Sequence, residues 1–532
     1  MNAARHSLRV AGVVLLSTLL LGSPAARAAV DSAGAAPSGP LESPGLDAAA
    51  RAHPVTFLDR LGWGADGEQL RELQDMGATR FLQAQLRPPA RPALPASIAP
   101  SLDGLAVDAP LQDWVPSLVA KQRRIRMQAR ADGGAAAASQ AKAQLEALRR
   151  QHDALTREAM AQQLLLDVYA PDQLRQRLVW FWMNHFNVFR GGFVGPMMGD
   201  YEMRVIAPHA LGHFRDLLRA TMFSPQMLLY LNNAQNARRH INENYAREVM
   251  ELHTLGMGSG YTQADVTHLA HVLTGLGVDL RDRPIRVRPA LRGLVWREGL
   301  VVFNPARHDP APEIVLGHVL QGRGVDEIEQ LVTLLADSPA TARHLCFELA
   351  QYFVADQPDP AMVAAMVRTW QRSDGDIAAV LRTLFTSPQF VASLSRPQFK
   401  DPMRYVISGV RASLHGRSIR NPRPMLGMLA RLGEPLYGRS TPDGYPIDGA
   451  AWDSPGQLGT RFRIARQLGA GAPAMFASAP RGSVRAPDLA HGAVYLAARP
   501  SLRPSTAATL AQVRGRVRWN ALWLASPEFM ND

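Results

Sequence analysis

The stretch from residue 242 to residue 275 constrains the fold of this chain more than any other, because it predicts two helices joined by a glycine-rich turn. Asn242 is suited to cap the first helix, and Glu243 follows in its first turn, where a negative charge is favoured by the helix dipole. Three closely spaced glycines end this helix. Thr262 and Asp265 then resemble a capping box that begins the second helix.

The first predicted helix carries several polar groups that can do chemistry. At about 100° per residue, Arg247, Glu248 and Glu251 share one of its faces, whereas His253 lies on the opposite, apolar side. The two carboxylates can therefore act together as metal ligands or as acid and base, beside Arg247. The alternative is that they form salt bridges with arginines on a half-buried face. For His253 the alternatives are a metal ligand and a hydrogen-bonded histidine of the core.

Residues 174–188, LRQRLVWFWMNHFNV, are apolar on nearly all sides and predict a central helix. Asp172, after Pro171, is placed to cap it. His185, next to Asn184, is interpreted either as a metal ligand or as a buried side chain that forms structural hydrogen bonds.

A serine–proline pair recurs after three helical runs. It occurs at Ser224, Ser387 and Ser526, each followed by proline and then by glutamine or glutamate. Serine as the N-cap, with proline as the first helical residue, explains the recurrence without a repeat architecture. Each pair therefore predicts the start of a new helix.

Helical patterns cover most of the remaining chain, which predicts an all-α protein of many helices. They occupy residues 53–86, 111–169, 325–337, 340–355, 360–373, 376–392, 402–437, 456–468 and 506–530. Residues 281–320 break the pattern, and their alternation predicts a small hairpin or extended excursion. His308 and Asp309 follow an extended segment there and are expected in a loop with exposed chemistry; the alternative is a structural role.

The chain is expected to form one large helical domain over residues 53–532, after two segments of other kinds. Residues 1–28 predict a secretory signal peptide, with a basic start, a short apolar run and a small-residue cleavage site. Residues 29–50, rich in Ala, Gly, Ser and Pro, predict a disordered leader. Residues 125–145 are expected to be a variable, mobile insertion with a weakly specified break at Gly133 and Gly134, and residues 470–504 to be loop-rich. A periplasmic or secreted protein without a membrane-spanning segment is therefore expected.

Charge and cysteine content exclude several classes of function. The formal net charge is +12, and arginine supplies nearly all of it, since lysine is rare. The arginines are scattered and not clustered, which argues against nucleic acid as a partner. The single cysteine, Cys346, excludes an internal disulfide, and its apolar neighbours predict a buried structural thiol.

Standard catalytic signatures are absent from the sequence, including HExxH, CxxCH, a P-loop, a Rossmann glycine set and a G-x-S-x-G turn. Any metal site must therefore be assembled from separate segments. The hypothesis is that polar groups far apart in the chain meet at one buried pocket, namely His185, Glu248, Glu251, His308 and Asp309.

These segments together resemble a bacterial family called domain of unknown function 1800. The matching motifs include DRLGWG at residues 59–64, WFWMNHFNV at 180–188, NENYAREVMELHTLG at 242–256, FNPARHD at 303–309 and VLG at 315–317. The resemblance implies an exported protein of unassigned activity. It also implies a partner, namely an exported sulfatase-like protein encoded nearby.

The resemblance also implies a set of motif residues. They are Asn184, His185, Asn244, Arg247, Glu248, Glu251, His253, Asp265, His308 and Asp309. The chain departs from the family pattern at His271, where arginine is usual, at Leu276, where tryptophan is usual, and at Glu313, where lysine is frequent. The resemblance therefore gives no support to a site built around His271, or to a site that needs the lysine found in the family where this chain has Glu313.

Two hypotheses about function are consistent with these residues. In the first, the protein is an enzyme acting on an envelope or extracellular polymer, with the catalytic residues Arg247, Glu248, Glu251, His308 and Asp309. A divalent metal in such an enzyme would be held by His185, Glu248, Glu251 and His253. In the second, the protein is a non-catalytic envelope assembly or binding protein, and its polar residues fix the packing of its helices.

Overall fold

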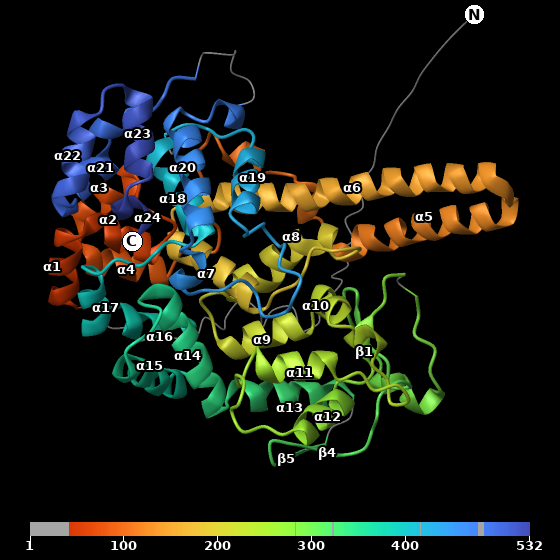
Figure 1. The fold of residues 1–532 in the computed structure, drawn as a ribbon. Coiled ribbons are helices and arrows are strands. Elements are labelled where there is room, and N and C mark those ends of the chain that lie inside the picture. Colours follow the sequence, from red (N-terminus) through yellow and green to blue (C-terminus); the bar gives the residue numbers. More distant parts are fainter. Residues whose placement is uncertain (1–41, 282, 322–323, 415, 477–483) are drawn as a thin grey trace, which may run out of the picture. The chain divides into compact units, whose positions relative to one another are not determined.

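The computed structural model describes residues 42–281, 283–321, 324–414, 416–476 and 484–532. These residues are mostly helical, with two small antiparallel sheets (Figure 1), so the predicted fold class is confirmed. The predicted signal peptide and residues 29–41 of the predicted leader lie outside the described residues. No helix in the described ranges has the length and apolar character that crossing a membrane requires.

Twelve α-helices precede the first strand in the described part of the chain. They are α1 (Pro44–Ala52), α2 (Pro54–Leu61), α3 (Gly67–Met76), α4 (Ala78–Leu86), α5 (Leu111–Asp132), α6 (Gly134–Tyr169), α7 (Gln173–His185), α8 (Met198–Asp200), α9 (Phe214–Met222), α10 (Pro225–Tyr230), α11 (Asn244–Glu251) and α12 (Gln263–Val272).

The described helices after the strands follow the predicted ranges closely, except for a short helix at Ala493–Ala498 within the residues expected to be loop-rich. They are α13 (Val325–Ala336), α14 (Pro339–Phe353), α15 (Pro360–Arg372), α16 (Ile377–Phe385), α17 (Pro388–Ser393), α18 (Pro402–Leu414), α19 (Arg423–Arg431), α20 (Pro455–Gly469), α21 (Ala493–Ala498), α22 (Pro504–Gln512), α23 (Arg516–Leu524) and α24 (Pro527–Met530).

Short strands between α12 and α13 form two antiparallel sheets. The first has the order β1-β3-β2, from β1 (Leu276–Val278), β2 (Trp296–Glu298) and β3 (Val301–Phe303). The second is a hairpin of β4 (Glu313–Val315) and β5 (His318–Leu320). The predicted extended excursion at 281–320 is therefore observed, although Pro289–Leu294 form a 3₁₀-helix within it.

The recurring serine–proline pairs begin helices, as predicted. The side chains of Ser224, Ser387 and Ser526 each accept the backbone N–H of the residue three positions later, at the starts of α10, α17 and α24. Proline follows each serine as the first helical residue, where its missing N–H costs nothing. These local signals therefore fix three helix starts.

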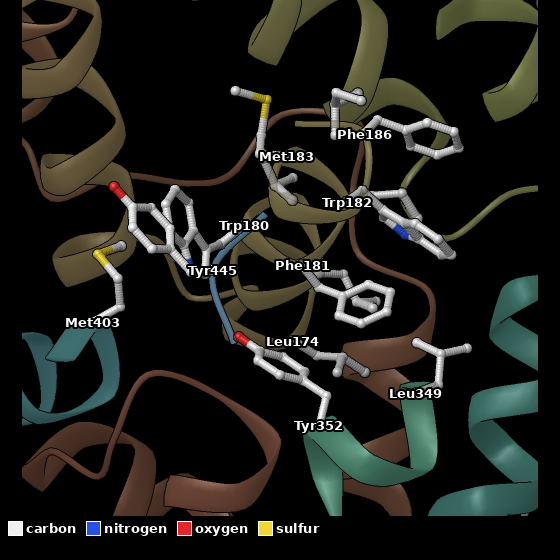
Figure 2. Packing of buried hydrophobic residues seen from close by; sticks show 14 of the residues in the cluster. Leu174, Trp180, Phe181, Trp182, Met183, Phe186, Leu349, Tyr352, Met403 and Tyr445 are labelled. Atoms are coloured by element: carbon white, nitrogen blue, oxygen red, sulfur yellow. The ribbon is translucent and has the colours of Figure 1, made fainter. Parts of the chain in front are cut away.

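Helix α7 lies within the hydrophobic core, as its apolar pattern predicts. Trp182 is fully buried, and the ring centroids of Phe181 and Tyr352 lie 5.2 Å apart. Trp180 stacks on Tyr445 with ring centroids 6.5 Å apart. Figure 2 shows side chains from distant parts of the sequence packed around this helix.

Two of the local predictions are wrong. Residues 44–50 of the predicted disordered leader belong to helix α1, because Leu46 and Ala50 are buried against other helices. Asp172 precedes α7 but forms no capping bond. Its carboxylate pairs instead with Arg175 and accepts a hydrogen bond from Gln176.

The predicted insertion at residues 125–145 is helical. It comprises the end of α5 and the start of α6, which meet at Gly133, a residue with φ of 60°. The predicted break at the paired glycines is therefore observed, and the two helices run side by side as a hairpin (Figure 1).

The DRLGWG motif connects the N-terminal helices to the C-terminal part of the chain. Lys400 Nζ lies 2.6 Å from Asp59 Oδ2, and the side chains are 1% and 7% exposed. Gly64 has φ of 126°, and a Cβ there would lie 2.5 Å from the Cβ of Ser408. The motif thus supplies both a buried charge and the close backbone approach that only glycine permits.

Candidate functional site

A histidine–carboxylate centre is built from α12, strand β4 and the loop before that strand (Figure 1). His268 and His271 are three residues apart in α12 and therefore share a face. Strand β4 packs against this helix, and its alternating burial makes Glu313 buried and Ile314 exposed. Asp309 comes from the loop between β3 and β4.

Ligand atoms of His271, Asp309 and Glu313 all lie within 4.8 Å of one another. His271 Nδ1 is 2.8 Å from Asp309 Oδ2 and 3.5 Å from Glu313 Oε1. The other oxygen of Glu313 is hydrogen-bonded to His268 Nδ1 at 2.5 Å. One imidazole and two carboxylates can therefore bind a common cation, which we call the candidate metal centre.

The hairpin that carries Glu313 is fastened to the start of α12. Thr262 and Asp265 form the predicted capping box, and Asp265 Oδ1 also accepts the Leu316 N–H at 2.7 Å. Leu316 and Gly317, with φ of 52° and 77°, form the turn between β4 and β5. This backbone conformation is the one that tight hairpins prefer, and it accounts for the VLG motif.

Thr274 and Gly275 fix the loop that carries Asp309. Thr274 Oγ1 accepts the Asp309 N–H at 2.8 Å and donates to the His271 carbonyl oxygen at 2.6 Å. Gly275 has φ of 83°, and a Cβ there would lie 2.8 Å from the Asn304 carbonyl oxygen. The Thr-Gly pair at the end of α12 therefore holds Asp309 beside His271.

The Asp309 carboxylate is held in its ionised form. Partial burial alone would raise its pKa, but hydrogen bonds from His271 and from the Ala311 N–H outweigh burial and place the pKa below its usual value. Ionised carboxylates and imidazole are ligands that zinc and related divalent ions take in proteins. The donor set therefore fits a divalent metal.

His308 is buried, so the expectation of exposed chemistry is wrong for this residue. Only 5% of it is exposed. Its Nδ1 lies 3.0 Å from the Thr274 carbonyl oxygen, which can only accept, so Nδ1 carries a proton. Its Nε2 lies 3.2 Å from Glu327 Oε2. His308 thus anchors the loop of Asp309 to α13.

The predicted polar residues of α11 form a separate group on a half-buried face. Arg247 pairs with Glu243 at 3.5 Å and with Glu251 at 3.4 Å. Burial and the nearby Glu251 raise the pKa of Glu248 above its usual value. The two acids therefore share a face and influence each other, while their catalytic role stays a prediction.

His185 and His253 belong to a third group, together with His344 and Glu348. Glu348 Oε2 lies 2.8 Å from His185 Nδ1, and Glu348 Oε1 lies 3.3 Å from His344 Nε2. His185 Nε2 lies 3.2 Å from the His253 carbonyl oxygen. Burial and the neighbouring His185 lower the pKa of His253 to about 3, so its ring is neutral. His253 is thus a core histidine that is 1% exposed.

The residues of the single-pocket hypothesis are distributed over these three groups. Within the described part of the chain, no hydrogen bond or ion pair joins Glu248 or Glu251 to His185 or His308. The metal-binding role predicted for His185, Glu248, Glu251 and His253 therefore stays a prediction. Of all the predicted site residues, Asp309 is the one that belongs to the candidate metal centre.

Sequence reasoning missed several residues of these groups, namely His268, His271, Glu313, Glu327, His344 and Glu348. A usable signal existed for the first two, because histidines three residues apart in a capped helix lie on one face. Nothing local identifies Glu313, since its partner His271 comes from a different element. The family pattern gives no signal for His271 and Glu313 either, because arginine and lysine are usual at these positions.

Comparison with known proteins gives one match. A family model described as "Protein of unknown function (DUF1800)" matches residues 56–531. No curated protein and no solved structure matches the chain.

Proposed function

Because the chain belongs to the DUF1800 family, whose function is unknown, we propose a function from its own residues: the protein is a hydrolase that depends on a divalent metal held by His271, Asp309 and Glu313. One observation carries the proposal, the approach of an imidazole and two carboxylates from separate segments to within 4.8 Å of one another. A divalent cation would balance the charges of two ionised carboxylates.

The residues around the three ligands support this function. His268 holds the second oxygen of Glu313, and Thr274 holds the backbone of Asp309, so each carboxylate has an orienting partner. Three protein ligands are typical of catalytic zinc sites, where a further position stays open for water or substrate. A divalent metal bound there would lower the pKa of water and polarise the bond to be hydrolysed.

The polar group of α11 is proposed to serve the same reaction. Helix α11 packs against α12, and Arg247 reaches Gln263 of α12 at 2.8 Å. A carboxyl group with a raised pKa, such as Glu248, gives up its proton closer to neutral pH than an ordinary carboxyl group. This supports Glu248 as an acid, Glu251 as its partner and Arg247 as a substrate-binding group. His308 contributes by anchoring the loop of Asp309.

The proposed substrate is a polymer of the envelope or the extracellular space. The signal-like residues 1–28 support export to the periplasm or beyond. The net charge of +12 supports attraction to anionic material. The family resemblance supports an exported sulfatase-like protein as a partner.

Metal analysis of the purified full chain tests the proposal. After equilibration with Zn²⁺ or Mn²⁺ and removal of free metal, mass spectrometry of the elements should find stoichiometric metal in the unaltered protein. His271→Ala and Asp309→Asn should lose it. His318→Ala is the matched control, because His318 is exposed on the neighbouring strand β5, and should retain it. Equal metal content in all four proteins, or none in the unaltered protein, would remove the proposal.

Activity separates the metal-dependent enzyme from the non-catalytic alternative. The unaltered protein should hydrolyse envelope polymers or chromogenic esters and phosphodiesters, lose this activity on chelation and regain it with metal. Glu248→Gln should retain metal and lose activity. The assembly role would be supported instead if the protein were inactive and free of metal and captured a protein partner. In that case the Glu251→Gln variant should also have a lower melting temperature.

A further inference from the structure

A second feature, separate from the candidate metal centre, is a cavity of about 860 Å³. It lies where the hairpin of α5 and α6 meets α19 and the loop at residues 189–193. Its volume falls within the range of small-molecule sites. None of its lining residues belongs to the metal centre, the polar group of α11 or the histidine group.

Much of the cavity wall is apolar. Leu148 and Met160 come from α6, Phe193 from the loop and Leu426 from α19. These side chains are buried or half-buried, although they border space large enough for a ligand. The wall therefore suits a hydrocarbon chain.

Cationic side chains line the same cavity. Arg126 comes from α5, Arg149 and Arg157 from α6, and Arg190 from the loop, whereas Asp153 is the carboxylate among the lining residues. Within the described residues, Arg126, Arg149 and Arg157 form no ion pair or side-chain hydrogen bond. Their charges are therefore available to an anion, and guanidinium groups suit carboxylates and phosphates in particular.

His152 adds a buried polar atom to the wall. The residue is 9% exposed, and its Nε2 has no hydrogen-bond partner among the described residues. Its ring packs edge-on against Phe193 with centroids 5.7 Å apart. Buried polar atoms are normally satisfied, so a ligand that enters the cavity can supply the missing partner.

From these observations we infer that the cavity binds an anionic amphiphile, with an acyl chain against the apolar wall and a carboxylate or phosphate head among the arginines. A neutral lipid would leave the arginines without a partner, and a free inorganic anion would leave the apolar wall without contacts. The ligand class thus follows from the two kinds of side chain in one cavity.

A neighbouring cavity of about 480 Å³ adjoins the first. It lies between α5 and α6 and shares Arg126, Leu145 and Arg149 with the first. Arg130, Lys142 and Glu146 also line this second space, so cationic groups outnumber carboxylates there as well and add to the charge that attracts an anionic head.

Calorimetric titration of the full chain tests the inference. The ligands are laurate, dodecyl phosphate and dodecyltrimethylammonium, which share a chain length and differ in the head, each below its critical micelle concentration. At least one of the two anions should bind tenfold or more tightly than the cation. Binding of laurate alone identifies a carboxylate head, and binding of dodecyl phosphate alone identifies a phosphate head. Equal affinity for anions and cation, or no binding of either anion, would overturn the inference.

Variants locate the site. The double variant Arg149→Ala, Arg157→Ala should lose at least tenfold in affinity for the anion. Its matched control is Arg123→Ala, Arg124→Ala, because both arginines are exposed on α5 and do not line the cavity; this variant should bind normally. Ala430→Trp should fill the cavity from α19 and abolish binding without removing any charge. Unchanged binding by the double variant, with its circular dichroism also unchanged, would refute the site.

Discussion

At the scale of the residue, Glu348 illustrates how neighbours decide protonation, because it lies between His185 and His344. Burial alone would raise the pKa of Glu348, but attraction to the two imidazoles and hydrogen bonds with them hold it well below its usual range. Burial alone would lower the pKa of His344, but the hydrogen bond to Glu348 outweighs burial, so the pKa of His344 lies above its usual value. Each residue thus favours the charged form of the other.

These shifts predict that the pair stabilises the fold most at mildly acidic pH. The depressed pKa of Glu348 contributes stability above about pH 4.3, and this is lost as the pH falls through the folded pKa. The raised pKa of His344 contributes stability below about pH 6.5, which is lost as the pH rises through the folded pKa. Glu348→Gln should therefore lower the free energy of unfolding by about 2–4 kcal/mol near pH 5.5 and by less at pH 8.5.

Denaturant titration of both proteins at the two pH values measures the difference. Glu146→Gln is the control, because Glu146 is exposed on α6, and it should change stability little at either pH. An equal loss for Glu348→Gln at both pH values would show that the histidine pair contributes through packing and not through charge.

The position of a single residue could be predicted where the pattern that identifies it lies within a few neighbouring residues. Thr262 and Asp265 are predicted correctly because a capping box spans only four residues. The apolar surroundings of His253 correctly predict its burial, although α11 ends at Glu251 and its geometry does not extend to this residue. The pairing of His271 with Glu313 is not predictable in this way, since it depends on the docking of a hairpin on a helix.

At the scale of the element, Asp265 performs two tasks that substitution can separate. It closes the cap of α12 with Thr262 and also binds the Leu316 N–H of the β4–β5 turn. Thr262→Ala should cost about 1 kcal/mol of stability through the cap alone. Asp265→Ala should in addition release the hairpin that carries Glu313, and so weaken metal binding by about 10–100-fold.

Thermal unfolding and Zn²⁺ titration of both variants measure the two effects. The expected pattern is a lower melting temperature for both, with metal affinity reduced only in Asp265→Ala. Equal metal affinity in the two variants would mean that the turn does not position Glu313. The stability result does not depend on the metal and tests the cap by itself.

Element boundaries were predictable where the chain marks them locally and not elsewhere. The serine–proline pairs and the glycine break at Gly133 carry their own signals. Helix α11 ends at Glu251, before the glycines that were expected to end it, and the N–H groups of Leu252 and His253 both bond to the Glu248 carbonyl oxygen. The contact of the His253 carbonyl with His185 comes from a distant helix, and no pattern within α11 predicts it.

At the scale of the whole described chain, buried charges join segments that are distant in sequence. Asp59 and Lys400 are 341 residues apart yet form a direct ion pair. Asp532 pairs with Arg60 and Arg404, all of them buried. Sequence alone gives no sign of these pairs, because separate charged residues resemble surface residues until the fold brings them together.

Removing one partner of such a pair should destabilise the whole domain. Lys400→Met leaves the carboxylate of Asp59 buried without its cation, although Asp59 still accepts the Ala65 N–H. The expected loss is about 3–5 kcal/mol of the free energy of unfolding, since an unpaired buried charge costs far more than an exposed one.

Lys121→Met is the matched control, because Lys121 is exposed on α5, and should change stability by about 0.5 kcal/mol or less. Adding Asp59→Asn to Lys400→Met should recover part of the loss, because the remaining side chain is neutral. A loss as small as that of the control, measured by denaturant titration, would mean that water reaches this pair and that the helices before residue 87 are held by apolar packing instead.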